Sequence, residues 1–205
     1  MTTLWSGRFD SAPDAAAFEF GASFTFDRRL FEDDVTGSIA WARALAKAGV
    51  LPLDEARQIE ETLADILQKG RARTAFVTGD DEDVHSFVER LLVEKLGDAG
   101  RRLHTGRSRN EQVSVDLRLY LRRRILLLQR ALAGVVDALA EQAALAGDAL
   151  MPSFTHFRQA QPVLVAHFFL AHVASLRRDH ERLTAARSEA DALPLGSGAI
   201  AGTSY

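Results

Sequence analysis

Apolar residues recur at intervals of three and four positions through most of the chain, which is the pattern of amphipathic α-helices. The strict alternation that marks half-buried strands is nearly absent. Helices are therefore predicted over about residues 27–48, 54–69 and 83–97, the third of them after an acidic turn at 79–82. A glycine that suits a helix end stands at the end of each: Gly49, Gly70 and Gly97. This pattern predicts an all-α fold that opens with a small N-terminal helical domain, residues 1–106.

Two longer helices are predicted in the second half of the chain. Residues 108–145 contain no proline and a single glycine, Gly134, and a helix of that length would span about 55 Å. Another long helix is predicted from Pro162, which suits a first helical turn, to about Leu193. Because apolar residues occupy more than one face, these helices need helical neighbours. Residues 107–205 are therefore predicted to be the first part of a central long-helix bundle shared between subunits.

The first 26 residues lack this periodicity. Glycines, Pro13 and several aromatic residues are scattered through them, so we expect an irregular segment whose rings lie across the following helices. The rings in question are Trp5, Phe9, Phe18, Phe20, Phe24 and Phe26.

The composition is that of an ordinary soluble globular protein, with 47% hydrophobic and 26% charged residues. The net charge of -3 gives no reason to expect nucleic acid, and the arginines within 118–124 are interpreted as a solvated helix face. There is no cysteine, which fits a cytoplasmic location. The start of the chain does not resemble a signal peptide. The most apolar stretch, Val163 to Leu176, is short and carries two histidines, so no membrane contact is predicted.

Two polar segments interrupt the helices and carry groups able to bind an anionic substrate. The first, His104 to Gln112, combines a glycine with Ser108 and Asn110 at a helix start, where backbone amides bind carboxylates. Taken alone, this segment could equally be a capped helix start whose arginines lie in solvent. The second, Met151 to Pro162, includes Thr155, His156, Gln159 and Gln161. A histidine there can move protons near neutral pH, or be a hydrogen-bonded linker residue.

The other histidines are weaker candidates. His85 follows Asp83, whose carboxylate could orient it, but it can also be read as a helix-start residue. His167, His172 and His180 lack the spacing of a helical metal pair and are interpreted as packing or surface residues. No metal site and no organic cofactor are predicted.

Six segments together resemble the argininosuccinate lyases of the fumarase and aspartase superfamily. The most specific is HTGRSRNEQV, because fumarases, aspartases and adenylosuccinate lyases differ there. The segments are LWSGRF at 4–9, SFTFDRRL at 23–30, DEDVHSFVE at 81–89, HTGRSRNEQV at 104–113, SFTHFRQAQPV at 153–163 and PLGSGAIAGTSY at 194–205.

The resemblance implies an anti β-elimination that splits argininosuccinate into arginine and fumarate, a step of arginine biosynthesis that needs no cofactor. It implies that His156 is the catalytic residue, as proton acceptor or as a partner that stabilises the base. It also implies a substrate pocket and two supporting residues. The pocket residues are Ser23, His85, Ser108, Arg109, Asn110 and Thr155, and the supporting residues are Asp83 and Gln161.

The resemblance further implies a homotetramer in which three subunits build each active site. The signature loop of the family, G-S-S-x-M-P-x-K-x-N-P, supplies a catalytic serine and does not occur before Tyr205. We therefore expect this chain to be truncated and inactive on its own. Three alternatives stay open: a crystallin-like structural assembly, another fumarate-releasing lyase of the superfamily, and a helical interaction module.

Overall fold

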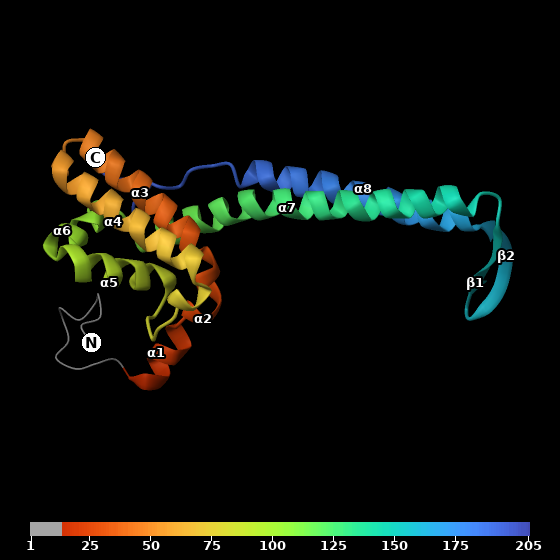
Figure 1. The fold of residues 1–205 in the computed structure, drawn as a ribbon, viewed down its shortest axis with the longest axis horizontal. Helices are drawn as coiled ribbons and strands as arrows, with labels where there is room; N and C mark the ends of the chain where they lie inside the picture. The colour runs from red at the N-terminus through yellow and green to blue at the C-terminus, as the bar shows by residue number, and fades with distance from the viewer. Residues whose placement is uncertain (1–13) are drawn as a thin grey trace. The chain divides into compact units, whose positions relative to one another are not determined.

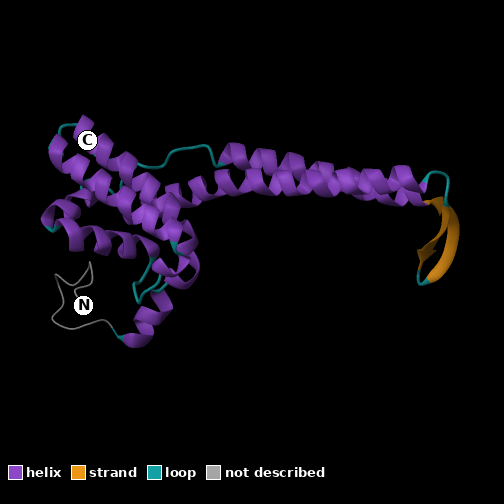
Figure 2. Cartoon of the chain, in the orientation of Figure 1, coloured by secondary structure: helices purple, strands orange, loops and turns teal. Residues whose placement is uncertain are grey.

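The computed structural model describes residues 14–205 and is dominated by helices (Figures 1 and 2). Those residues divide into two compact units. One comprises residues 14–120 together with Leu193–Tyr205, and the other comprises Leu121–Ala192. The elements are α1 (Ala15–Gly21), α2 (Phe24–Asp27), η2 (Arg28–Leu30), α3 (Phe31–Lys47), α4 (Leu53–Ala72), η3 (Thr74–Phe76), α5 (Val84–Leu96), α6 (Asp98–Arg101), η4 (Arg102–His104), α7 (Arg109–Ala146), β1 (Leu150–Thr155), β2 (Arg158–Leu164) and α8 (Val165–Glu189), where η marks a 3₁₀ helix.

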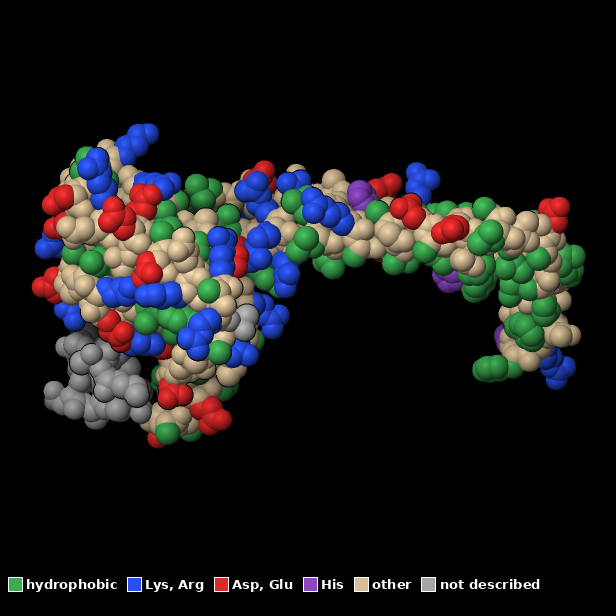
Figure 3. All heavy atoms as spheres, in the orientation of Figure 1, with side chains coloured by type: hydrophobic (Ala, Val, Ile, Leu, Met, Phe, Trp, Pro, Cys, Tyr) green, Lys and Arg blue, Asp and Glu red, His purple; other side chains and the backbone are tan. Residues whose placement is uncertain are grey.

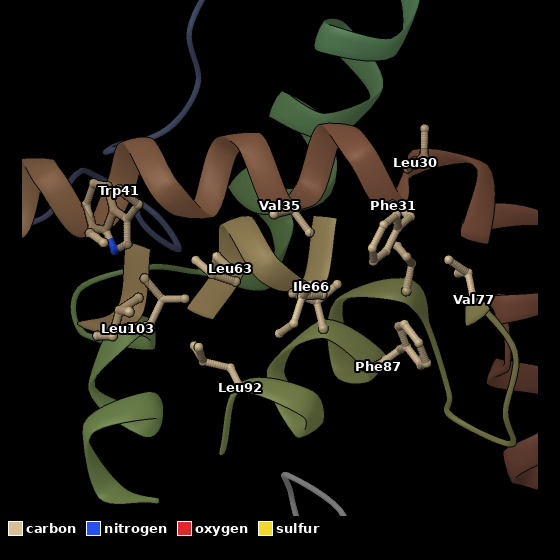
Figure 4. Packing of buried hydrophobic residues seen from close by; sticks show 14 of the residues in the cluster. Leu30, Phe31, Val35, Trp41, Leu63, Ile66, Val77, Phe87, Leu92 and Leu103 are labelled. Atoms are coloured by element: carbon tan, nitrogen blue, oxygen red, sulfur yellow. The ribbon is translucent and has the colours of Figure 1, made fainter. Parts of the chain in front are cut away.

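The core of the first unit lies between α3, α4 and α5 (Figure 4). Each fully buried aliphatic side chain contributes about 1.5–3 kcal/mol relative to an exposed one. Phe31 and Phe87 pack edge to face with their ring centroids 6.2 Å apart. The largest fully buried apolar side chains are Val35, Leu45, Ile59, Leu63, Ile66, Val84, Phe87 and Leu92. These residues hold α5, which carries His85, at a fixed position against α3.

Gly70 shows how closely α3 and α4 approach. A Cβ atom at this position would come within 2.2 Å of the Phe31 ring. The prediction that Gly70 ends the second helix was wrong, because α4 continues to Ala72. The glycine serves close packing rather than helix termination.

The N-terminal segment differs from the irregular structure expected for it. Residues Ala15–Gly21 form α1, and the Asp14 carboxylate caps this helix by accepting hydrogen bonds from the amides of Ala16 and Ala17. Phe24 is buried in the core, whereas Phe20 and Phe26 are exposed. The expectations for Trp5, Phe9 and the segment 4–9 lie outside the described residues.

In the second unit, α8 runs antiparallel to the C-terminal part of α7 (Figure 1). The Arg122 and Asp191 side chains form an ion pair at 3.2 Å, and Gln129 donates a hydrogen bond of 2.9 Å to Thr184. Large apolar side chains nevertheless lie exposed on these helices and on the hairpin, as Figure 3 shows. On the two helices they include Leu126, Leu127, Leu128, Val135, Leu145, Phe168 and Leu170.

Strands β1 and β2 form an antiparallel hairpin where a polar linker was expected (Figure 2). Its two turn residues, His156 and Phe157, have φ values of 50° and 61°, the left-handed conformation of a two-residue hairpin turn. The prediction that Pro162 starts a helix was wrong, because it pairs with Pro152 in the ribbon and α8 begins at Val165. A two-stranded ribbon tolerates proline because both of its strands are edges.

The all-α fold class is confirmed, with β1 and β2 as the only strands within residues 14–205. The domain boundary predicted near residue 106 stays a prediction, since α7 runs through both compact units. Over the described part of the chain, no helix combines the length and apolar character that crossing a lipid bilayer requires.

Candidate active site

The polar segment before α7 forms a capped helix start. Glu111 accepts a hydrogen bond of 2.8 Å from the Ser108 amide, and the Ser108 hydroxyl accepts one of 3.3 Å from the Asn110 amide. This is the reciprocal arrangement of a capping box. The amides of Ser108 and Asn110 are thus bonded within the chain. The exposed Asn110 side chain lies at the positive end of the α7 dipole, which favours an anionic ligand.

Glu111 also ties the C-terminal segment to this helix start. Its second carboxylate oxygen accepts hydrogen bonds from the amides of Gly196 at 2.6 Å and Gly198 at 2.9 Å. Burial opposes ionisation, but these backbone amides and that of Ser108 outweigh it and lower the pKa of Glu111. Tyr205 belongs to the same segment, and its ring lies so close to Gly106 that a Cβ there would come within 2.6 Å of it. Residues 194–205 therefore support the loop that leads into α7.

Arg109 faces acidic groups of α5 from the first turn of α7. Its guanidinium donates a hydrogen bond of 3.1 Å to the Gln112 side-chain oxygen. It lies 3.5 Å from the Glu89 carboxylate and 3.8 Å from that of Asp83. Burial raises the pKa of Glu89 even though Arg109 and Arg107 are near. The structure therefore brings two of the predicted site residues, Asp83 and Arg109, close together.

Asp83 and His85 are neighbours in sequence, but their side chains have different partners. Asp83 is the N-cap of α5 and accepts a hydrogen bond of 2.6 Å from the Ser86 amide. The His85 ring is buried, with 2% of its side chain exposed. In this structure His85 is enclosed by its own chain, and the carboxylates that contact it belong to Asp34 and Asp116.

Asp34, His85 and Asp116 form a buried ionic cluster. The His85 Nδ1 lies 2.8 Å from Asp34 Oδ1 and 3.2 Å from Asp116 Oδ2. Burial alone would lower the pKa of His85, but hydrogen bonds and charge from both carboxylates raise it to about 10. Burial and the neighbouring Asp34 charge raise the pKa of Asp116, whereas His85, Arg107 and Gln112 overcome burial and lower that of Asp34. The directions of these shifts favour the imidazolium form of His85 and the carboxylate form of Asp34, and they oppose the ionisation of Asp116.

The same three side chains offer ligand atoms within 4.8 Å of one another, a spacing that could hold a metal ion. A metal would require a deprotonated His85 nitrogen on the metal side. However, Nδ1 faces both carboxylates directly at hydrogen-bond distance. We therefore interpret the group as an ion cluster.

Stability is expected to fall as the pH rises from neutral toward 10. The folded-state pKa of His85, about 10, lies above its ordinary value of 6.5. Its contribution is therefore complete below about pH 6.5 and is lost as the pH approaches 10. The raised pKa of Asp116 acts in the same direction. Urea unfolding of the full natural protein at a series of pH values should show a loss on the order of a few kcal/mol. A flat profile between pH 7 and 10 would contradict the charge state assigned to the cluster.

Ser23 lies beside the start of α5. Its hydroxyl donates a hydrogen bond of 2.5 Å to Asp27, whose other oxygen accepts one of 3.1 Å from the Val84 amide. The Ser23 amide donates to the Glu82 carbonyl at 2.8 Å. Burial raises the pKa of Asp27, and the bonds from Ser23 and Val84 act against that rise. This network fixes Ser23 relative to α5.

Thr155, His156 and Gln161 lie in the hairpin of the second unit. His156 occupies the exposed turn, and Thr155 pairs with Arg158 next to it. The backbone carbonyl of Gln161 accepts a hydrogen bond of 2.6 Å from Ser153. The other predicted site residues, Ser23, Asp83, His85, Ser108, Arg109 and Asn110, belong to the first unit.

Comparison with known proteins identifies the protein family to which the chain belongs. The family described as Lyase matches residues 7–205, and the chain belongs to this family. The structure is also similar to EDDS lyase in complex with formate, with a TM-score of 0.68 and 24% identity over 93% of this chain and 37% of that one. The 3-carboxy-cis,cis-muconate lactonizing enzyme from Pseudomonas putida gives a TM-score of 0.69 and 24% identity over 91% of this chain and 42% of that one. These two likenesses support the fold.

The sequence relatives of the chain indicate a narrower class of lyases than the family does. The argininosuccinate lyases of Thermoanaerobacter sp. (strain X514) and Thermoanaerobacter pseudethanolicus (strain ATCC 33223 / 39E) are each 48% identical to the chain over 202 residues. The match covers 98% of this chain and 45% of each relative, so the chain spans less than half of their length. The resemblance to argininosuccinate lyases that the sequence segments predicted is thereby confirmed.

Proposed function

We propose that the full natural protein containing these residues is an argininosuccinate lyase, which releases arginine and fumarate. The observation that carries the proposal is the start of α7. There the cationic Arg109 and the exposed Asn110 lie on a capped helix N-terminus, in a chain 48% identical to argininosuccinate lyases. The guanidinium and the side-chain amide donate hydrogen bonds, which suits the carboxylates of a succinyl group.

The chemistry needs fixed donors for the negative charge that develops beside a carboxylate, and a group that moves a proton. We assign the role of these donors to Ser23, Ser108, Asn110 and Thr155. We assign to Arg109 the binding of a substrate carboxylate whose charge does not change during the reaction. We assign the proton-moving role, or that of stabilising the base, to His156. We expect His85 to influence the site through the charge of its buried cluster and not by touching the substrate, because its ring is enclosed.

A homotetramer, with each site shared between three subunits, is part of the same proposal. It is supported by the apolar side chains exposed on α7 and α8, since contiguous exposed apolar surface marks interaction sites. A cytoplasmic enzyme of arginine biosynthesis that uses no cofactor is the corresponding expectation.

The test is fumarate release, followed by ultraviolet absorbance, after argininosuccinate is added to the full natural protein. Production of fumarate and arginine in equal amounts is the expected result. If a well-folded tetramer released no fumarate from argininosuccinate, the function would be excluded. Fumarate from another succinyl compound would then indicate a different lyase, and no turnover of any such compound would favour a crystallin-like structural role.

A further inference from the structure

Gln112 connects the buried cluster to the arginine of the candidate site. We propose that Gln112 is a positioning residue: its side-chain amide, fixed by Asp34, holds the Arg109 guanidinium in place for an anionic group of the substrate. This inference rests on the proposed function, because it assigns Arg109 to substrate binding. The sequence analysis singled out Arg109 but gave no role to Gln112.

The two ends of the Gln112 amide are chemically distinct, and their partners determine which end faces which way. The amide nitrogen donates a hydrogen bond of 2.6 Å to Asp34 Oδ1, and the amide oxygen accepts one of 3.1 Å from Arg109. An ionised carboxylate can only accept, so the NH₂ group must face Asp34. The oxygen is then left for the guanidinium, which can only donate. Reversing the amide would break both bonds.

The enclosure of Gln112 makes this orientation rigid. Gln112 is 3% exposed, and a buried polar group without a partner costs about 1–3 kcal/mol. Its neighbour Asp34 is 1% exposed and also contacts His85. Gln112 is thus anchored at one end by residues that belong to the core, while its other end reaches the site.

A neutral partner has an electrostatic advantage for a substrate-binding arginine. The carboxylates of Asp83 and Glu89 lie 3.8 Å and 3.5 Å from Arg109, beyond the distance of a strong hydrogen bond. The Gln112 oxygen at 3.1 Å orients the guanidinium without neutralising it. Gln112 therefore orients the guanidinium without adding a further carboxylate to the two that already lie within ion-pair distance of it.

The spacing along α7 makes the connection direct. Arg109 and Gln112 are three residues apart, and Gln112 and Asp116 are four apart, so all three lie on one helix face. Asp116 contacts His85 at the inner end of this face, and Arg109 lies at the outer end. The face thus runs from the ion cluster to the candidate site.

The test is Gln112→Met in the full natural protein, which keeps the length of the side chain and removes both hydrogen bonds. The KM for argininosuccinate should rise about 10-fold with a much smaller change in kcat, because a carboxylate contact acts alike on bound substrate and transition state. Gln129→Met removes a glutamine hydrogen bond elsewhere on α7 and should leave KM unchanged. An unchanged KM in Gln112→Met would overturn the inference.

A double-mutant cycle separates positioning from general damage. In an Arg109→Met background, Gln112→Met should change kcat/KM by less than about 2-fold, because the group that it positions is gone. Equal losses in both backgrounds would show that Gln112 acts independently of Arg109, against the proposal. If Gln112→Met does not fold, Gln112→Asn keeps an amide that is too short to reach both partners. It should raise KM in the same way, and an unchanged KM would overturn the proposal.

A structural measurement distinguishes failure of this inference from failure of the proposed function. If the wild-type protein releases no fumarate from argininosuccinate, the proposed function is excluded. A crystal structure of Gln112→Met then decides the positioning role by itself. A displaced or disordered Arg109 side chain supports it, and an Arg109 side chain in its original place refutes it.

Discussion

Replacing His156 by asparagine in the full natural protein is expected to lower the kcat of fumarate release by at least about 100-fold, the lower range of a general acid–base contribution. Asparagine is suited to the position because it adopts left-handed backbone conformations more readily than most residues, and His156 has a φ of 50°. The side chain is exposed at the hairpin turn, so the helical fold should be unaffected. Fumarate absorbance gives the rate, and circular dichroism gives the helical content.

The neighbouring turn residue provides a matched control for this prediction. Phe157 has a φ of 61° and is fully exposed. Phe157→Asn therefore makes the same kind of change in the same turn and should retain most of the turnover. If His156→Asn turned over as fast as the wild type, His156 would have no part in the mechanism.

Replacing His85 by leucine is expected to lower the free energy of unfolding by about 3–5 kcal/mol at pH 7, since it leaves a buried carboxylate without its partner. Asp34 has its pKa lowered largely by His85. Without the imidazolium, Asp34 must either stay charged in the core or take up a proton. Urea unfolding at a fixed protein concentration measures the loss, and the concentration must be fixed because subunit association contributes to stability.

His104→Leu is the matched control for that substitution. Burial and the charges of Arg107 and Arg109 lower the pKa of His104 to about 4, so its ring is neutral at pH 7. Its removal leaves no buried charge unpaired and should cost about 1 kcal/mol or less. Equal losses for the two variants would mean that His85 stabilises the protein by packing and not by charge. In His85→Leu, the decline in stability toward pH 10 should also be smaller.

The helices of the first unit could be predicted because their buried positions follow a period of 3.6 residues. Residues such as Val35, Leu63 and Phe87 interdigitate in one core, and helices α3, α4 and α5 match the predicted ranges to within a few residues. Helix α7 also matches its range, to within about one residue at each end. A long run with helical periodicity and without proline predicts one uninterrupted helix.

The hairpin could not be predicted from the same signals. Its turn consists of His156 and Phe157, neither of which is the glycine or asparagine that usually marks a left-handed turn. Each strand also contains a proline, Pro152 and Pro162, which argued against a strand. Pairing of the two strands supplied the stabilisation that local propensity lacks.

The burial of Asp34 and Asp116 was not predicted, because charged residues usually lie on the surface. Asp34 and Asp116 are charged, so the apolar periodicity that predicted the helices does not mark them as core positions. Yet Asp34 lies three residues after Phe31 and four before Ser38, both of them buried, and this spacing was a usable signal of a buried face. Their partnership with His85 joins three helices and depends on tertiary packing. No local pattern shows such a contact.

The hydrogen bonds between Glu111 and the C-terminal segment affect the order in which the protein folds on the ribosome. Its carboxylate bonds the amides of Gly196 and Gly198, which lie 85 and 87 positions later in the chain. At roughly 5–20 residues per second, roughly 4–17 s pass between translation of Glu111 and translation of Gly198. During that interval water must solvate the oxygen that later receives both amides. These two hydrogen bonds to the loop before α7 can therefore form only after α7, the hairpin and α8 have been synthesised.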